Sequence, residues 1–275
     1  MNIEEKILSL FEKNEKSREL LEWFNNDKQN QELLKLYNSK NEVIKEIEEL
    51  NKELKCRPLA LLLPSVPQNY QKSKYQIMAI GQELNGGYGI RSEPRITMLD
   101  NLRGQSFDDL SRRGFFSFPS ELCHAVNEIG GKLNRKEIRS YFVWAEIRKF
   151  SYHKKIDSKS KAPRTQLNKE VQNLIDTKFN ILEDEIRIIN PDIVLFLTGH
   201  NYDNYIEKQL SGVDFKAVKG YKEKQFARVE HKVLPEKSFR IYHPNAFRQG
   251  SVIKSLGRRY LYKEFLKRLV EECKK

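Results

Sequence analysis

Short apolar runs that end in polar turns are the clearest pattern along this chain. Residues 77–80 (IMAI) lead directly into Gly-Gln-Glu, and residues 192–197 (DIVLFL) lead into Thr-Gly-His. Apolar runs of this length, bounded by turn signals, are typical of strands buried on both faces. Residues 141–150 (YFVWAEIRKF), which a glutamate interrupts, and residues 238–247 (SFRIYHPNAF) have the same form. The pattern therefore predicts four strands that each end in polar residues.

Helical periodicity fills the intervals between these strands. We predict helices around residues 117–130, from about residue 166 to Ile189, and from about Ser251 to Glu272. The second of these is expected to end at Asn190-Pro191, because proline cannot continue a helix. Strands that alternate with helices predict an α/β domain with a mostly parallel central sheet.

Residues 1–56 have a different pattern and are predicted to form an N-terminal helical region. Apolar residues recur at helical spacing around Ile3 to Phe11 and again around Val43 to Leu54, with a polar stretch between them. Such stripes are typical of core packing or of self-association between copies of the chain. Three prolines follow Cys56, so we place the boundary of the α/β domain there, at residues 57–275.

Two classes of protein are disfavoured by composition. The chain has no apolar run of 18 residues and no short apolar segment behind a basic amino terminus, which predicts a cytoplasmic protein without a membrane partner. Its three cysteines are far apart, with neither a CxxC pair nor a disulfide framework. We therefore expect no metal and no other cofactor.

The charge is strongly basic and unevenly spread. The formal net charge is +12, yet residues 1–55 hold 10 basic against 13 acidic residues, which leaves +15 for the remainder. Residues 216–275 alone hold 17 basic and 6 acidic residues. This excess favours a polyanion such as double- or single-stranded DNA as partner, with a merely soluble basic surface as the alternative.

Three of the polar turns carry candidate chemistry: GQELNGG (81–87), WAEIRKF (144–150) and YHPNAF (242–247). The carboxyl ends of parallel strands share one edge of a sheet, where α/β proteins place their ligands. This set resembles the uracil-DNA glycosylase superfamily, whose motifs have the forms GQDPY, an apolar strand carrying an Asn, and HPSPL. The resemblance covers roughly Tyr75 to Arg268 and implies a three-layer fold that flips a base from DNA and hydrolyses its N-glycosidic bond without a cofactor.

The resemblance implies a role for each matching residue. Glu83 stands at the aspartate that orients the attacking water, and His243 at the histidine that donates to the departing base. Gln82 matches the family's opening Gly-Gln, Glu146 falls at its base-reading Asn, and Leu84 replaces its proline. By the same matching, Asn245 stands at a phosphate-contacting serine and Phe247 at the apolar wedge that enters the duplex.

Further residues near these motifs are candidates for contact with DNA. Asn85 and Tyr88 follow the first motif and are expected either to line the base pocket or to form a surface turn. The phosphate contacts we expect are basic residues of the 151–164 loop and of the chain after the third motif, namely Lys154, Lys155, Arg248, Lys254, Arg258 and Arg259.

Two functions follow from these patterns. One is a DNA glycosylase; the other is a catalytically silent module of the same fold that binds DNA or a modified nucleotide. Glu146 bears on the target base, because an ionised carboxylate offers only acceptors and would repel uracil O4. A protonated glutamic acid would instead accept from N4 of cytosine and donate to N3. We therefore expect a modified cytosine, of a kind found in foreign (viral) DNA, rather than uracil.

Overall fold

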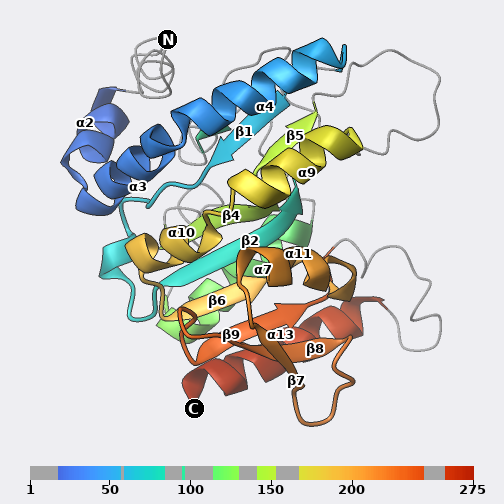
Figure 1. Ribbon diagram of the computed structural model, residues 1–275. Helices are drawn as coiled ribbons and strands as arrows, with labels where there is room; N and C mark the ends of the chain where they lie inside the picture. Colours follow the sequence, from blue (N-terminus) through green and yellow to red (C-terminus); the bar gives the residue numbers. More distant parts are fainter. Residues whose placement is uncertain are drawn as a thin grey trace.

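The computed structural model describes residues 18–56, 59–83, 95–96, 114–129, 141–152, 167–244 and 258–275 (Figure 1). The elements in chain order are α2 (Arg18–Asn26), α3 (Lys28–Ser39), α4 (Asn41–Glu53), β1 (Leu59–Leu63), η2 (Tyr70–Lys72), β2 (Ile77–Glu83), β3 (Arg95–Ile96), α7 (Gly114–Asn127), β4 (Phe142–Arg148), β5 (Phe150–Tyr152), α9 (Lys169–Lys178), α10 (Leu182–Ile189), β6 (Ile193–Phe196), η4 (His200–Tyr202), α11 (Asp203–Gln209), β7 (Asp214–Ala217), β8 (Phe226–Glu230), β9 (Lys237–Ile241) and α13 (Arg258–Lys274). The chain is thus α/β. None of the helices in these ranges is both long and apolar enough to span a bilayer.

The larger sheet has six strands in the order β4-β2-β6-β9-β8-β7. The first four strands of this order run parallel, whereas β8 is antiparallel to β9 and β7 is antiparallel to β8. The sheet is therefore mixed, and the prediction of a mostly parallel sheet is wrong. The reason is the length of the connections, since segments as short as 218–225 and 231–236 can join only antiparallel neighbours.

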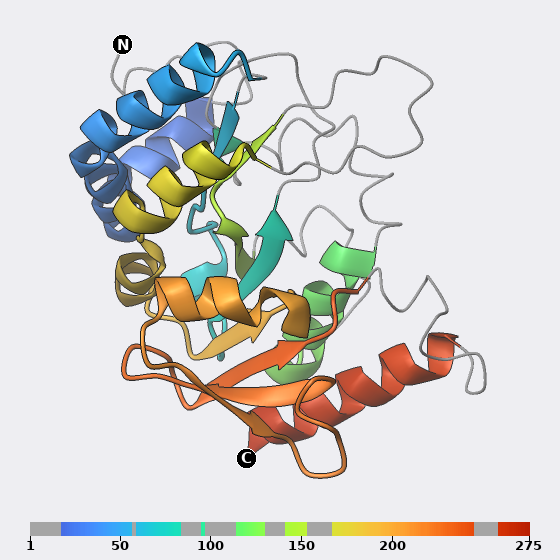
Figure 2. The ribbon, with the colours of Figure 1, turned by 45° about the vertical axis from the view of Figure 1, so that its right-hand side comes forward.

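Helices cover both faces of this sheet (Figure 2). On one face Ile77, Ala79 and Phe239 pack in one apolar cluster with residues of α7 and α13. On the other face Met78 and Ile80 pack with residues of α10 and α11. All four residues of β6 are fully buried, as the apolar run predicted, because they contribute to both clusters.

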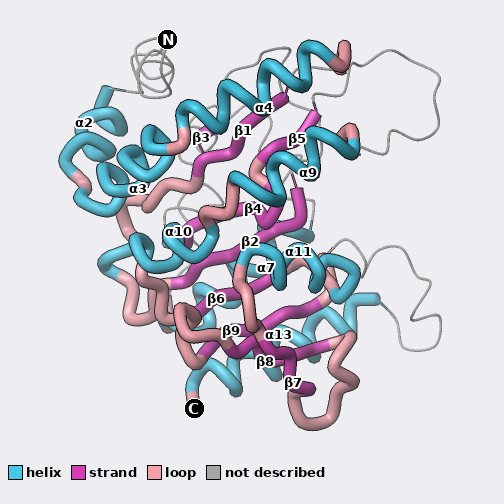
Figure 3. Tube along the Cα trace, viewed as in Figure 1, coloured by secondary structure: helices cyan, strands magenta, loops and turns pink. Residues whose placement is uncertain are grey.

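A second, smaller sheet has the order β3-β1-β5 and borders the first (Figure 3). Its strand β5 begins two residues after β4 ends, so a single extended segment passes from one sheet into the other. Lys149 lies between the two strands, and its carbonyl accepts a hydrogen bond from Leu62 N–H at 2.9 Å. The segment predicted as one strand, residues 141–150, thus contains β4 of the larger sheet and the start of β5 of the smaller sheet.

The N-terminal helices pack on this smaller sheet. Phe24, Tyr37, Ile44 and Ile47 belong to one buried cluster with the leucines of β1, with Phe150, and with residues of α9. The apolar stripe around Val43 to Leu54 therefore packs within the chain. The earlier stripe, around Ile3 to Phe11, lies outside the described residues.

Residues 166–189 form two helices where one was expected. Helix α9 ends before Phe179 and α10 begins at Leu182, and both Phe179 and Ile181 are fully buried. Both side chains belong to the same buried cluster. Residues two apart point in different directions on a continuous helix, so the break allows both side chains to reach that cluster. Helix α10 does end at Asn190, which adopts left-handed backbone geometry (φ 46°) before Pro191.

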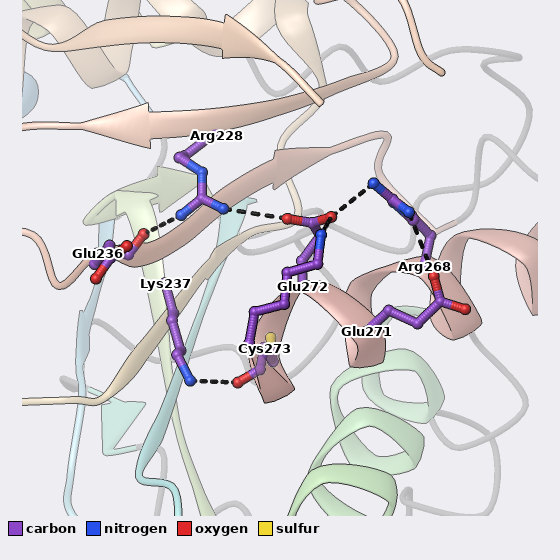
Figure 4. A network of polar contacts seen from close by, with 8 residues as sticks. Arg228, Glu236, Lys237, Arg268, Glu271, Glu272 and Cys273 are labelled. Carbon is purple, nitrogen blue, oxygen red and sulfur yellow. Dashed lines mark hydrogen bonds and ion pairs between the residues drawn. The ribbon is translucent and has the colours of Figure 1, made fainter. Parts of the chain in front are cut away.

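Helix α13 runs antiparallel to β9, with its C-terminal end fixed to the sheet by a polar network (Figure 4). Glu272 accepts from Arg228 of β8 at 3.2 Å and pairs with Arg268 at 2.7 Å. Lys237, at the start of β9, donates to Cys273 O at 2.5 Å. The first residues of α13 consequently lie at the opposite end of β9, toward its carboxyl terminus.

Candidate functional site at the carboxyl edge of the sheet

The candidate site lies where β2 and β6 end side by side. The strand order places β4 on one side of β2 and the later strands on the other, so the chain reverses its direction across the sheet between β2 and β6. The next α-helix after β2 among the described residues is α7, which packs on one face, whereas α11 follows β6 and packs on the opposite face. A crevice at such a reversal is the usual ligand site of an open α/β sheet.

Gln82 joins the two strand ends. Its Nε2 donates to the carbonyl oxygen of Thr198 at 2.6 Å. Strand alternation places Gln82 on the side of Ile80, toward α10 and α11, with Gly81 on the side of α7 and α13. The Gln82 amide thus ties the end of β2 to the residues that follow β6.

Gly199 brings the end of β6 against the turn that follows β9. Its N–H donates to Ile241 O at 2.9 Å, and a Cβ added to it would make an ordinary contact, at 3.7 Å, with the backbone nitrogen of His243. Gly199 has a φ of 71°, in the left-handed region where side chains are strained, so the backbone geometry favours glycine here. Thr198 and Gly199 were not predicted as site residues, although their place directly after the buried strand was a usable signal.

Glu146 lies on β4 in direct register with Gly81. The residue is 3% exposed, and its Oε1 accepts a hydrogen bond from Trp144 Nε1 at 3.0 Å. Trp144 and Glu146 are two residues apart and so share the face that α7 and α13 cover. The carboxylate of Glu146 is thus buried beside Gly81, which has no side chain.

His243 follows β9 by two residues, and burial lowers the pKa of its imidazole to about 4. The ring is therefore neutral at physiological pH, with one N–H donor and one acceptor nitrogen. Its neighbour Tyr242 packs edge to face against His200, with ring centroids 6.2 Å apart. Burial, followed by the charges of Arg240 and Lys224, lowers the pKa of His200 as well.

A buried arginine at this edge was missed by the sequence patterns. Arg240 is fully buried on β9; its Nη2 donates to Asp203 Oδ2 at 3.1 Å and its Nη1 to Glu223 O at 2.9 Å. Burial raises the pKa of Asp203 to about 6, although the charge of Arg240 opposes the rise. Its place as a charged residue within the apolar run SFRIY could have indicated it, just as Glu146 is a charged residue within an apolar run.

The structure brings some of the predicted site residues to this edge. Gln82, Glu146 and His243 all lie at the carboxyl ends of their strands, and β2 extends to Glu83, whose backbone stands in register with Arg148. Arg258 and Arg259 open α13 at its end nearest this edge. The remaining candidates lie outside the described residues, namely Asn85, Tyr88, Lys154, Lys155, Asn245, Phe247, Arg248 and Lys254.

Comparisons of the sequence with known families and proteins found no match. No protein-family model matches the chain, and no curated protein matches it. Within the part of the chain that the structure describes, no three His, Cys, Asp or Glu residues gather in a way that would hold a metal ion.

Proposed function

We propose that this protein is a DNA glycosylase that flips a base into the carboxyl edge of its sheet and hydrolyses the N-glycosidic bond. One observation carries the proposal: the strands that bear the three family-like motifs, β2, β4 and β9, all belong to the parallel part of the sheet and end at one edge. The described parts of motifs that are far apart in the chain thus lie along one edge of the sheet, which supports the proposal.

The chemistry needs a donor toward the departing base. Bond cleavage leaves negative charge on the base and positive charge on the sugar. His243, neutral because burial lowers its pKa to about 4, donates one N–H to the base oxygen at the position where charge develops. An N–H held in place before the reaction stabilises that charge without reorganising.

The chemistry also needs an acceptor for water. Glu83 ends β2 at the same edge, and its carboxylate orients the attacking water and offsets the positive charge on the sugar. Glu146, buried on the neighbouring strand, reads the base edge. In its protonated form it accepts from N4 and donates to N3, which selects a cytosine edge over that of uracil. Because release of ordinary cytosine would damage any genome, the proposed target is a modified cytosine such as those in foreign DNA.

The test is incubation with DNAs that carry a panel of normal and modified bases, followed by alkali cleavage at abasic sites. We expect release of a modified cytosine, and a decrease of about 10²- to 10³-fold in rate for His243→Ala, the magnitude typical of one removed donor. Glu83→Ala should decrease the rate at least as much. Base release that both variants leave unchanged would remove these residues from the mechanism.

The pH profile offers an independent readout of His243. Because its pKa lies near 4, below the ordinary 6.5, His243 should cause no change in the rate as the pH falls through 6.5. Protonation adds a positive charge and a second N–H donor to the ring, so any effect of its titration on the rate should appear only toward pH 4. DNA binding without release of any base would instead identify the catalytically silent module.

A further inference from the structure

The connection between β7 and β8, residues 218–225, places three lysines at the same edge as the candidate site. Lys219, Lys222 and Lys224 are exposed, and none of them forms an ion pair with any residue that the structure describes. Lys216, on the adjoining strand, differs because it pairs with Glu230 and Asp214. We refer to residues 218–225 as the basic loop.

The basic loop is built onto the sheet beside His243. The residue that follows it, Phe226, pairs in register with Ile241, which ends β9 two residues before His243. Lys224 is also one of the charges that lower the pKa of His200, whose ring packs on Tyr242. Lys224 thus stands within electrostatic reach of His200, and the register of β8 with β9 places the loop at the same edge as His243.

Hydrogen bonds within the loop fix its shape. Val218 N–H donates to Phe226 O at 3.1 Å, and Tyr221 N–H donates to Val218 O at 2.9 Å. Phe226 N–H donates in turn to Lys222 O at 3.1 Å. Gly220 has a φ of 92°, which a glycine adopts without strain.

Contacts from other elements hold the loop as well. The Tyr221 ring packs against Phe226 and against Phe265 of α13, with centroids 5.4 and 4.9 Å apart. Arg240, itself clamped by Asp203, donates to Glu223 O at 2.9 Å from inside the sheet. A buried arginine is thereby used to anchor the backbone of a surface loop.

Exposed lysines without acidic partners add little to stability, and three of them within six residues repel one another. Only one acidic side chain, that of Glu223, lies in the loop, so its net charge is +2. A fixed backbone that presents such cations is suited to a polyanion, because little conformational entropy is lost on binding. The excess of +15 outside residues 1–55 points to the same kind of partner.

We propose that the basic loop is a preformed contact for the DNA backbone, in which Lys219, Lys222 and Lys224 bind phosphates next to the base-flipping edge. The inference rests on the proposed function for the identity of the polyanion as DNA. It adds a phosphate-binding surface that none of the motifs indicated.

The test compares the variant Lys219→Gln/Lys222→Gln/Lys224→Gln with a control that removes the same charge elsewhere. The control is Lys35→Gln/Lys52→Gln/Lys72→Gln, at exposed lysines of α3, α4 and η2. Affinity for a short DNA duplex is measured across a series of salt concentrations, for several unrelated sequences.

The loop variant should bind every sequence more weakly and reduce the salt slope of log K by about three units, about one for each phosphate that is no longer neutralised. The control should change the slope by less than about one unit. An equal change in both variants would assign binding to net charge alone and overturn the inference, as would an unchanged slope in the loop variant.

Base release by the same variants separates this inference from the proposed function. If the native protein binds DNA but releases no base, the slope comparison still tests the loop. If the native protein releases a base and the loop variant binds DNA unchanged, the loop assignment alone fails.

Discussion

At the residue scale, Glu146 is the side chain on which the proposed choice of target base depends most. It is buried, and Trp144 donates to one of its oxygens, which fixes the rotation of the carboxylate. A site whose polar groups are paired by the correct base rejects a mismatched edge strongly, because the mismatch leaves buried groups without partners.

Exchange of Glu146 should therefore switch the substrate. Glu146→Asn replaces the carboxyl group with one donor and one acceptor, the pair that uracil's O4 and N3–H require. We expect release of the modified cytosine to fall and release of uracil to rise, as measured by single-turnover cleavage of matched duplexes. Rapid uracil release by the native protein would contradict the assignment of Glu146 to base reading.

The family resemblance indicated this residue, because Glu146 falls at the base-reading Asn, whereas the apolar run alone was also compatible with an exposed carboxylate at the end of a strand. It could not indicate Trp144 as the hydrogen-bond donor, since a tryptophan in such a run is ordinarily part of the core. Arg240 also stands as a charged residue within an apolar run, and its partners, Asp203 at the start of α11 and Glu223 in the basic loop, are brought together only by the folded chain.

At the scale of elements, α13 depends on the network at its C-terminal end. The Glu272 side chain is 6% exposed and contacts Arg228, Arg268 and Lys275. Burial works against ionisation, yet the hydrogen bond from Lys275 and the three positive charges prevail and lower the pKa of Glu272. A lowered pKa means that this carboxylate stabilises the fold above its ordinary titration range and that the contribution disappears as the pH falls through its folded-state value.

Removing this charge should loosen α13 measurably. Glu272→Gln is expected to lower the free energy of unfolding by about 1–3 kcal/mol at pH 7, since it removes charged hydrogen bonds at a buried position. The matched control is Glu271→Gln, whose described ion pair with Arg268 spans 3.4 Å at a half-exposed position and should contribute less than about 1 kcal/mol. Urea denaturation at pH 7 measures both values, and the difference should shrink at acidic pH.

Elements with strong apolar runs were predicted well, whereas edge elements were not. Strand β6 and the start of β2 followed from apolar periodicity because they are buried on both faces. Strand β7 is mostly exposed and carries no alternation, and β1 is built from leucine and alanine, which have no marked strand preference. The break between α9 and α10 depends on the burial of Phe179 against Phe150, a contact between distant parts of the chain.

At the scale of the whole molecule, a buried ion pair joins the N-terminal helices to both sheets. Lys149, between β4 and β5, contacts Glu185 of α10 at 2.5 Å, and both side chains are at most 1% exposed. Tyr37 of α3 donates its hydroxyl to the other oxygen of Glu185. Burial, with the charge of Glu185, raises the pKa of Tyr37 well above its ordinary value, so the phenol stays neutral.

Loss of Glu185 should destabilise the entire chain. Glu185→Ala leaves the Lys149 ammonium buried without its counter-charge, and we expect a decrease of about 3–5 kcal/mol in the free energy of unfolding. Glu46→Ala removes the half-exposed partner of Lys178 and should decrease it by less than about 1 kcal/mol. A double variant, Lys149→Met/Glu185→Leu, should recover most of the stability; an equally unstable double variant would show that the charges themselves are not the cause.

The strand that continues from β4 into β5 has a further consequence for how the molecule opens. Because one stretch of backbone supplies hydrogen bonds to both sheets, release of this segment from one sheet leaves it tethered to the other. Glu146 stands only three residues from the crossing point at Lys149. We therefore expect fraying at the helical end of the molecule to be felt by the strand that carries Glu146, and the two sheets to unfold as one cooperative unit.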